Sequence, residues 1–139
     1  MSLLFRGLFR HQDLGLFIYR IVIGLAIFMH GLAKLQSSND VIASVGSAVS
    51  LLGIHSWYYE FGIVAALCEI IGGILVGIGL FSRLGSFMVC IVLAMAIWVQ
   101  YGTGFLHWIY PVEVGVGFLM IFIGGPGRYS IDYMITGRR

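Results

Sequence analysis

The chain has 139 residues, of which 60% are hydrophobic and 10% are charged, and its formal net charge is +2. An average soluble domain is about a quarter charged, and a soluble fold of this size leaves too much surface in water to hide so many apolar residues. With a mean hydropathy of +1.00, the chain is predicted to be an integral membrane protein, and the small charge without a basic stripe argues against nucleic-acid binding.

Residues 1–13 are predicted to form an amphipathic segment at the membrane surface. Four apolar side chains share one face of a helix here and three basic ones lie beside them: Leu4, Phe5, Leu8, Phe9, Arg6, Arg10 and His11. Basic residues that flank an apolar face suit anionic lipid headgroups. The apolar run that follows contains Arg20 and is too long for the core of a signal peptide, so we expect a retained helix.

Four apolar segments then follow, each near the ~20 residues that a helix needs to cross a hydrocarbon core of about 30 Å. They occupy residues 14–32, 61–80, 84–101 and 108–124. The second and third segments are so close in sequence that we expect them to form a tight antiparallel hairpin. The predicted fold is thus all-α, an integral membrane four-helix bundle within residues 14–124.

Two polar regions complete the predicted architecture. Residues 36–60 are expected to be an outer-side loop with a short helix, because apolar residues recur there at helical spacing but are too few to span. Residues 125–139 are expected to be a cytoplasmic tail, since glycine and proline at 124–127 end the last helix. In this tail Arg128 and Asp132 are expected to pair one turn apart.

The distribution of basic residues predicts the orientation in the membrane. One side of the predicted topology collects six arginines, and the other side has Lys34 alone. The six are Arg6, Arg10, Arg83, Arg128, Arg138 and Arg139. Because cytoplasmic segments carry the excess of positive residues, both termini are predicted to be cytoplasmic. Tryptophan and tyrosine gather at the opposite side, which agrees with an aromatic belt at that interface.

Several ionisable residues fall inside the predicted helices, where a charge costs several kcal/mol and needs a partner or a function. The candidates for a ligand or proton site are Arg20, His30, Lys34, Glu69 and Glu113. Most of them share a helical face with glycines, Gly31 and Gly73 among them. Since glycine lets a neighbouring helix approach closely, these charges are expected to face the interior of the bundle.

The rise of a helix predicts two clusters among these residues. Arg20 is expected near Glu69, deeper in the membrane, and Glu113 near His30 or Lys34 toward the outer face. The groups either form ion pairs that fix the helix register or line a polar pocket that binds a ligand headgroup or passes protons. An isolated buried glutamate could exchange protons near neutrality. Both interpretations stay open.

The cysteines and the remaining histidines give weaker signals. Cys68 and Cys90 lie in apolar runs without a CxxC pair and are interpreted as small buried hydrophobes. His30 and His107 are both expected near the outer face, where they could ligate one haem iron. No CxxCH motif accompanies them, so haem is disfavoured, and the sequence shows no zinc-like metal motif.

Three stretches stand in an order typical of one family: Arg20-x3-Gly24-x5-His30-Gly31-x2-Lys34-Leu35, then Glu69-x2-Gly72-Gly73 leading to Gly79-Leu80-Phe81-Ser82-Arg83, and finally Gly124-Gly125-Pro126-Gly127-Arg128-Tyr129-Ser130-Ile131-Asp132. Together they resemble the signatures of the DoxX family, over about residues 19–132. The resemblance implies a multi-pass four-helix protein of a bacterial or archaeal inner or plasma membrane. It makes seven residues members of a motif without giving them a catalytic role: Gly31, Gly73, Arg83, Gly125, Pro126, Arg128 and Asp132.

The resemblance also implies redox chemistry, since the family is named for a subunit associated with a terminal quinol oxidase and is similar to a thiosulfate:quinone oxidoreductase subunit. We therefore expect a membrane subunit that binds a quinone headgroup with Arg20, Glu69 or His30 and exchanges electrons with a partner protein. One alternative is a small transporter or channel that uses Glu69 and Glu113. Another is a membrane anchor whose charges only hold the bundle together. Association into a homo-oligomer through the glycine faces stays open.

Overall fold

The computed structural model describes residues 12–137, which contain no β-strand. Most of the amphipathic segment predicted at residues 1–13 lies outside the described residues, as do Arg138 and Arg139. Four long helices dominate the described part of the chain: α2 (Gln12–Leu35), α4 (Tyr58–Ile78), α5 (Ser82–Gln100) and α6 (Phe105–Gly124). Each is long and apolar enough to cross a membrane, so the predicted all-α four-helix fold is confirmed.

The long helices begin slightly earlier than hydropathy predicts. α4 begins at Tyr58 rather than at residue 61, and α6 begins at Phe105 rather than at residue 108. The extra turns contain polar residues such as Glu60, which lower the mean hydropathy of the segment and so hide the start of the helix. Such residues are ordinary at the membrane interface, where a helix continues beyond the hydrocarbon core.

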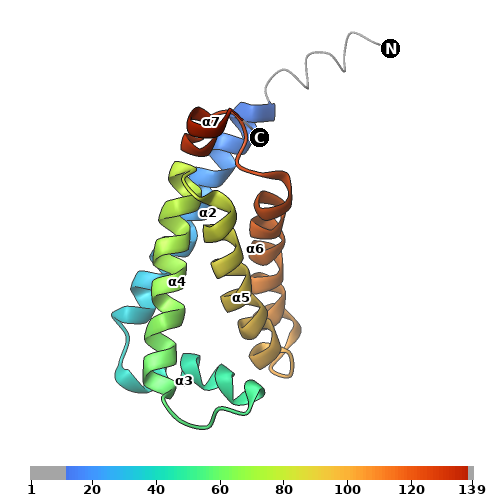
Figure 1. Ribbon diagram of the computed structural model, residues 1–139. Helices are drawn as coiled ribbons and strands as arrows, with labels where there is room; N and C mark the ends of the chain where they lie inside the picture. Colours follow the sequence, from blue (N-terminus) through green and yellow to red (C-terminus); the bar gives the residue numbers. More distant parts are fainter. Residues whose placement is uncertain (1–11, 138–139) are drawn as a thin grey trace.

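The four long helices stand side by side along one direction (Figure 1). In the described residues, α2 packs against α4, α4 against α5, and α5 against α6. Two short helices, α3 (Asn39–Gly46) and the 3-10 helix η2 (Ser47–Leu52), lie across one end of the bundle, and α7 (Ile131–Thr136) lies at the other. We call these the α3 end and the α7 end. Both ends of the described chain lie at the α7 end, as four crossings require.

Glycines set the distance between α2 and α4. A Cβ atom added to Gly24 would lie 2.6 Å from the carbonyl oxygen of Gly73, and one added to Gly31 would lie 2.7 Å from that of Ala66. Neither distance is tolerable for a real side chain, so the two backbones touch only because these positions are glycine. The expectation that Gly31 and Gly73 lie on packing faces is confirmed.

Glycines also allow direct backbone contact at the α3 end. A Cβ atom on Gly62 in α4 would collide with the backbone of Ile42 in α3, and one on Gly46 would collide with the backbone of Tyr58. The short helix expected within residues 36–60 therefore lies directly on the first turns of α4, and its position is fixed by backbone contact.

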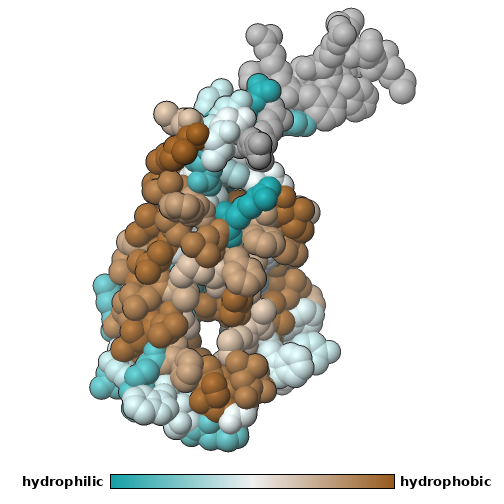
Figure 2. All heavy atoms as spheres, in the orientation of Figure 1, coloured by the Kyte–Doolittle hydropathy of each residue, from teal (hydrophilic) through white to brown (hydrophobic). Residues whose placement is uncertain are grey.

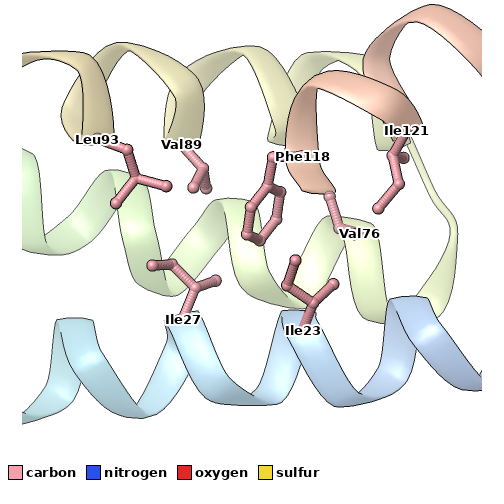
Figure 3. Close-up of a cluster of buried hydrophobic side chains, with 7 residues drawn as sticks. All are labelled: Ile23, Ile27, Val76, Val89, Leu93, Phe118 and Ile121. Atoms are coloured by element: carbon pink, nitrogen blue, oxygen red, sulfur yellow. The ribbon is translucent and has the colours of Figure 1, made fainter. Parts of the chain in front are cut away.

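One apolar core joins the four long helices (Figure 3). Its buried members come from α2, α4, α5 and α6: Ile23, Ile27, Val76, Val89, Leu93, Phe118 and Ile121. The outward faces of the same helices carry large exposed hydrophobic side chains, and on the face seen in Figure 2 they form a broad apolar band between more polar ends. Exposure of such a large apolar surface to water would cost too much free energy, so lipid is the solvent for this surface.

Candidate functional site

The most buried carboxylate of the bundle interior forms an ion pair near the α3 end. The Lys34 ammonium of α2 donates to Glu69 Oε1 of α4 over 2.6 Å. The Glu69 side chain is 2% exposed, whereas that of Lys34 is 24% exposed. Within the described residues Glu69 Oε2 has no hydrogen-bond partner. The pair is therefore a polar centre with free hydrogen-bonding capacity on both partners.

The expected pairing of Arg20 with Glu69 is wrong, and the register of α2 against α4 explains why. Gly24 faces Gly73 and Gly77, and Gly31 faces Ala66 and Ile70. Because the two helices run antiparallel, Arg20 lies level with the end of α4, between two and three turns away from Glu69. Lys34 lies beyond Gly31 on α2 and reaches Glu69 from the α3 end.

A cavity of about 550 Å³ adjoins this ion pair. It lies between α4 and α5, is bounded by α3 and η2, and includes Lys34 in its wall. Figure 2 shows the hollow at the α3 end of the bundle. Most of the lining is apolar, with contributions such as Val49, Phe61 and Met95. The polar residues that line it, Lys34, Ser44 and Gln100, belong to α2, α3 and the last turn of α5.

The two cysteines differ in their relation to this cavity. Both are free and half-buried. Cys68, next to Glu69 on α4, lines the cavity. Cys90 does not line it, and its thiol faces the carbonyl oxygen of Gly115 on α6 at 3.9 Å. The sequence interpretation of both as small buried hydrophobes missed this difference, because it depends on which helix faces which.

Arg20 belongs to a different cluster at the α7 end. Its side chain is fully buried, its Nη2 donates to the carbonyl oxygen of Tyr129, and its guanidinium carbon lies 5.9 Å from the centre of the Phe17 ring. Gly79, with φ +77°, leaves the space that the guanidinium fills, since a Cβ atom there would collide with Arg20 Nη1. Arg20 thus holds the segment after α6 against the α4–α5 turn.

Asp132 completes this cluster. Its carboxylate accepts from the backbone N–H groups of Phe81 (2.8 Å) and Ser82 (2.9 Å), and its own N–H donates to the Gly79 carbonyl oxygen at 2.9 Å. The expected Arg128–Asp132 pair is wrong, because α7 starts only at Ile131 and residue 128 is not helical. Arg128 lies against Asp13 instead, with Nε 3.5 Å from Oδ2.

The expected pairing of Glu113 with His30 or Lys34 is also wrong. Tyr110 of α6 and His30 of α2 share a hydrogen bond of 2.7 Å between the hydroxyl and Nε2, and Lys34 is paired with Glu69. Glu113 lies exposed on α6. Tyr110 was missed as a partner because an aromatic near a helix end is first interpreted as an interfacial anchor.

The histidines of the haem hypothesis have separate partners. His30 bonds Tyr110, and His107 Nδ1 lies 3.2 Å from the carbonyl oxygen of Thr103. Among residues 12–137 no group of three or more His, Cys, Asp or Glu side chains could hold a metal ion. Arg83, exposed at the start of α5, contributes a charge to the surface of the α7 end.

Comparison with known proteins gives two matches. The family model described as DoxX matches residues 15–102, from α2 through α5. A Bacillus subtilis (strain 168) protein named "Putative oxidoreductase CatD" is 33% identical over 85 residues, which cover 61% of this chain and 58% of that protein. The alignment thus spans a little over half the length of this relative. No solved structure matches.

Proposed function

The chain belongs to the DoxX family of membrane proteins, and from this premise we propose that it is a quinone-linked redox subunit that works with a partner protein. It binds the quinone headgroup beside Lys34 and exchanges electrons with that partner. The name of the Bacillus subtilis relative, an oxidoreductase, supports redox chemistry as the general class.

The observation that carries the proposal is a buried ion pair at the polar end of an apolar cavity. Ligand sites are typically cavities of about 300–1,000 Å³, mostly apolar with a few placed polar groups. The cavity of about 550 Å³ with Lys34 in its wall fits this description. A quinone has the matching chemistry, since its carbonyl oxygens accept hydrogen bonds and the rest of the molecule is apolar.

The ion pair suits the proton balance of the reaction. Reduction of a quinone to a quinol takes up two electrons and two protons, and oxidation releases them. In our proposal the partner protein supplies or removes the two electrons, and water at the α3 end, where Lys34 is 24% exposed, supplies or takes up the two protons. The Lys34 ammonium donates a hydrogen bond to a carbonyl oxygen as negative charge develops there. Glu69 orients the Lys34 ammonium through the ion pair of 2.6 Å, and removal of the carboxylate would leave a partly buried cation without a counter-charge.

The arrangement favours this function over a transporter. Lys34 with Glu69 lies toward the α3 end, Arg20 lies at the α7 end, and the core residues Ile23 and Ile27 lie between them on α2. Glu113, the second carboxylate of the transporter hypothesis, is exposed on α6 rather than turned toward Glu69. A proton or ion path through the described residues would have to cross either the packed apolar core or the apolar lining of the cavity along α5.

The proposal includes an orientation in the plasma membrane of a bacterium or archaeon. Arg83 and Arg128 lie at the α7 end, which we place on the cytoplasmic side. Trp57, Trp98 and Tyr101 are more than two-thirds exposed around the α3 end, where an aromatic belt would meet the outer headgroups. The quinone headgroup would then be reduced or oxidised near the outer face.

Extraction of bound quinone tests the proposed function. We expect organic extracts of the purified protein to contain quinone, and the amount to fall at least tenfold in Lys34→Met. The control is Arg83→Met, which removes an exposed charge at the other end and is expected to leave the amount unchanged. Quinone-free wild-type protein, together with no electron transfer to an added quinone, would contradict the proposal. A proton-coupled flux in vesicles would favour the transporter. Protein without bound quinone, electron transfer or proton flux would favour the anchor.

A further inference from the structure

The cavity is elongated along α5. Its lining residues on this helix run from Leu84, in the first turn, to Gln100, the last residue. At 1.5 Å per residue this is about 24 Å, close to the thickness of a hydrocarbon core. The cavity therefore runs across the membrane, parallel to the helices, and is far longer than a quinone ring.

One long side of the cavity opens toward lipid. Leu84, Phe87 and Ile91 line the cavity and are nevertheless 54%, 49% and 47% exposed. They belong to the central and first turns of a helix that is apolar enough to cross the membrane. A ligand can thus reach the cavity sideways from the bilayer, without passing through water.

The polar groups lie at one end only. Lys34, Ser44 and Gln100 are at the α3 end, and the wall toward Leu84 is apolar. The charge of Lys34 is already balanced by Glu69 at 2.6 Å. The polar end is therefore neutral as a whole, and an anionic phosphate headgroup would find no free positive charge there. A neutral carbonyl can accept from Lys34 without breaking the ion pair.

From these features we infer that the cavity holds a neutral-headed lipid with one long apolar chain, a quinone with an isoprenoid chain. Its head lies at Lys34 and its chain lies along α5 toward Leu84. The identification of the head as a quinone rests on the proposed function. The position of the chain rests on the shape of the cavity alone and makes Ile91, halfway along, a residue that determines chain specificity.

The native cysteines test occupancy without any substitution. Wild-type protein in lipid nanodiscs is treated with a membrane-permeant maleimide, and the labelling of each cysteine is followed by mass spectrometry. A fully substituted, isoprenylated benzoquinone is expected to slow labelling of Cys68 at least tenfold. Labelling of Cys90, equally half-buried but outside the cavity, is expected to stay within twofold. Equal slowing of both, or of neither, overturns the inference.

Chain length tests the pose. We compare quinones that have the same ring and isoprenoid chains of increasing length. The concentration of quinone that halves the labelling rate of Cys68 is expected to be at least tenfold lower for a chain that fills the cavity than for a quinone without a chain. Ile91→Trp is expected to abolish this gain and to leave the chainless quinone unaffected. The control is Val116→Trp on α6, where Val116 is 48% exposed, like Ile91 at 47%, and does not line the cavity. A gain that survives Ile91→Trp overturns the pose.

Other occupants give different results. Protection of Cys68 by phosphatidylglycerol as strong as that by the quinone would assign the cavity to phospholipid, and protection that rises with protein concentration alone would assign it to a second copy of the chain. Either outcome overturns the inference. Because labelling involves no electron transfer, protection without redox activity would keep the inference and contradict the proposed function. Redox activity without protection would do the reverse.

Discussion

Lys34 and Glu69 depend on each other unequally, because they differ in access to water. Glu69 is 2% exposed at its side chain and has one bonded oxygen, whereas Lys34 is 24% exposed and its long side chain can turn toward the α3 end. Removing one partner of a buried ion pair leaves an uncompensated charge and typically costs about 3–5 kcal/mol. The larger loss should follow when the buried carboxylate is the group that remains.

A double-mutant cycle at this pair measures the inequality. We expect Lys34→Met to lower the free energy of unfolding by about 3–5 kcal/mol and Glu69→Gln by clearly less. The double variant should recover most of the loss, since neither charge remains. Denaturation of the purified protein in mixed micelles gives these values. Additive effects of the two substitutions would show that the ion pair does not stabilise the fold.

The sequence identified both residues of this pair but not their partnership. A charged residue within an apolar helix stands out in the sequence, because placing its charge in lipid costs free energy. Arg20, Lys34 and Glu69 could therefore be found without a structure. Which of the two cations reaches the carboxylate depends on the offset between α2 and α4. That offset is set by the contact between Gly24 and Gly73, and a hydropathy pattern contains no information on it.

At the scale of secondary-structure elements, α2 and α4 are held together by backbone contact at glycine. Gly24 meets the backbone of Gly73, whereas a Cβ atom on Gly77, one turn further along α4, would meet nothing within 4 Å. The two positions look alike in the sequence, since both follow Glu69 at steps of four. They differ in the structure because the Cβ position of Gly77 points into open space, although its backbone nitrogen lies only 3.0 Å from a Cβ atom built on Gly24.

Alanine substitutions at Gly24 and Gly77 should therefore have different effects on the free energy of unfolding. Gly24→Ala is expected to destabilise the protein by about 1–3 kcal/mol, because the added methyl group overpacks a closed interface. Gly77→Ala should be neutral or stabilising by up to about 1 kcal/mol, since alanine favours the helix. The same unfolding assay compares the two, and an equal loss at both positions would contradict the assigned contact.

The segment after α6 acts as a cap on α5. The first N–H groups of a helix have no partner within it, and at the start of α5 the Asp132 carboxylate binds two of them from about fifty residues away. Loss of a capping side chain costs about 0.5–2 kcal/mol. The expected pairing with Arg128 failed because it assumed a continuous helix through a segment that is not helical.

Asp132→Ala should loosen the α7 end locally. We expect a loss of about 0.5–2 kcal/mol and faster hydrogen exchange at Phe81 and Ser82, with no change in exchange around Glu69. Asp40→Ala, which removes an exposed carboxylate on α3, serves as the control and should leave the exchange at the α4–α5 turn unchanged. Unchanged exchange in Asp132→Ala would argue against the cap.

At the scale of the whole molecule, the two ends of the bundle differ in composition and in role. The α7 end is held by Arg20 and Asp132 and contains no part of the cavity except its apolar limit near Leu84. The α3 end contains the ion pair and the polar groups of the cavity. We propose that the α7 end is cytoplasmic, which would place the headgroup site and the proposed redox partner on the outer side.

Labelling of single cysteines in intact cells tests this orientation. In a variant without Cys68 and Cys90, we expect a membrane-impermeant maleimide to label Ser38→Cys at the α3 end and to spare Arg83→Cys at the α7 end until the cells are opened. Both natural side chains are exposed at these positions. The reverse pattern would invert the topology and place the headgroup site toward the cytoplasm.

The sequence by itself determined the solvent, the four helices and the residues whose charge needs an explanation. These follow from composition and local periodicity, because lipid accepts only long apolar helices with internally satisfied backbones. Tertiary structure alone decided that Lys34 rather than Arg20 pairs with Glu69, that Asp132 caps α5, and that a cavity lies beside the ion pair. Each of these depends on the offset and rotation of one helix against another, which close contacts at a few glycines fix and which no single segment of sequence specifies.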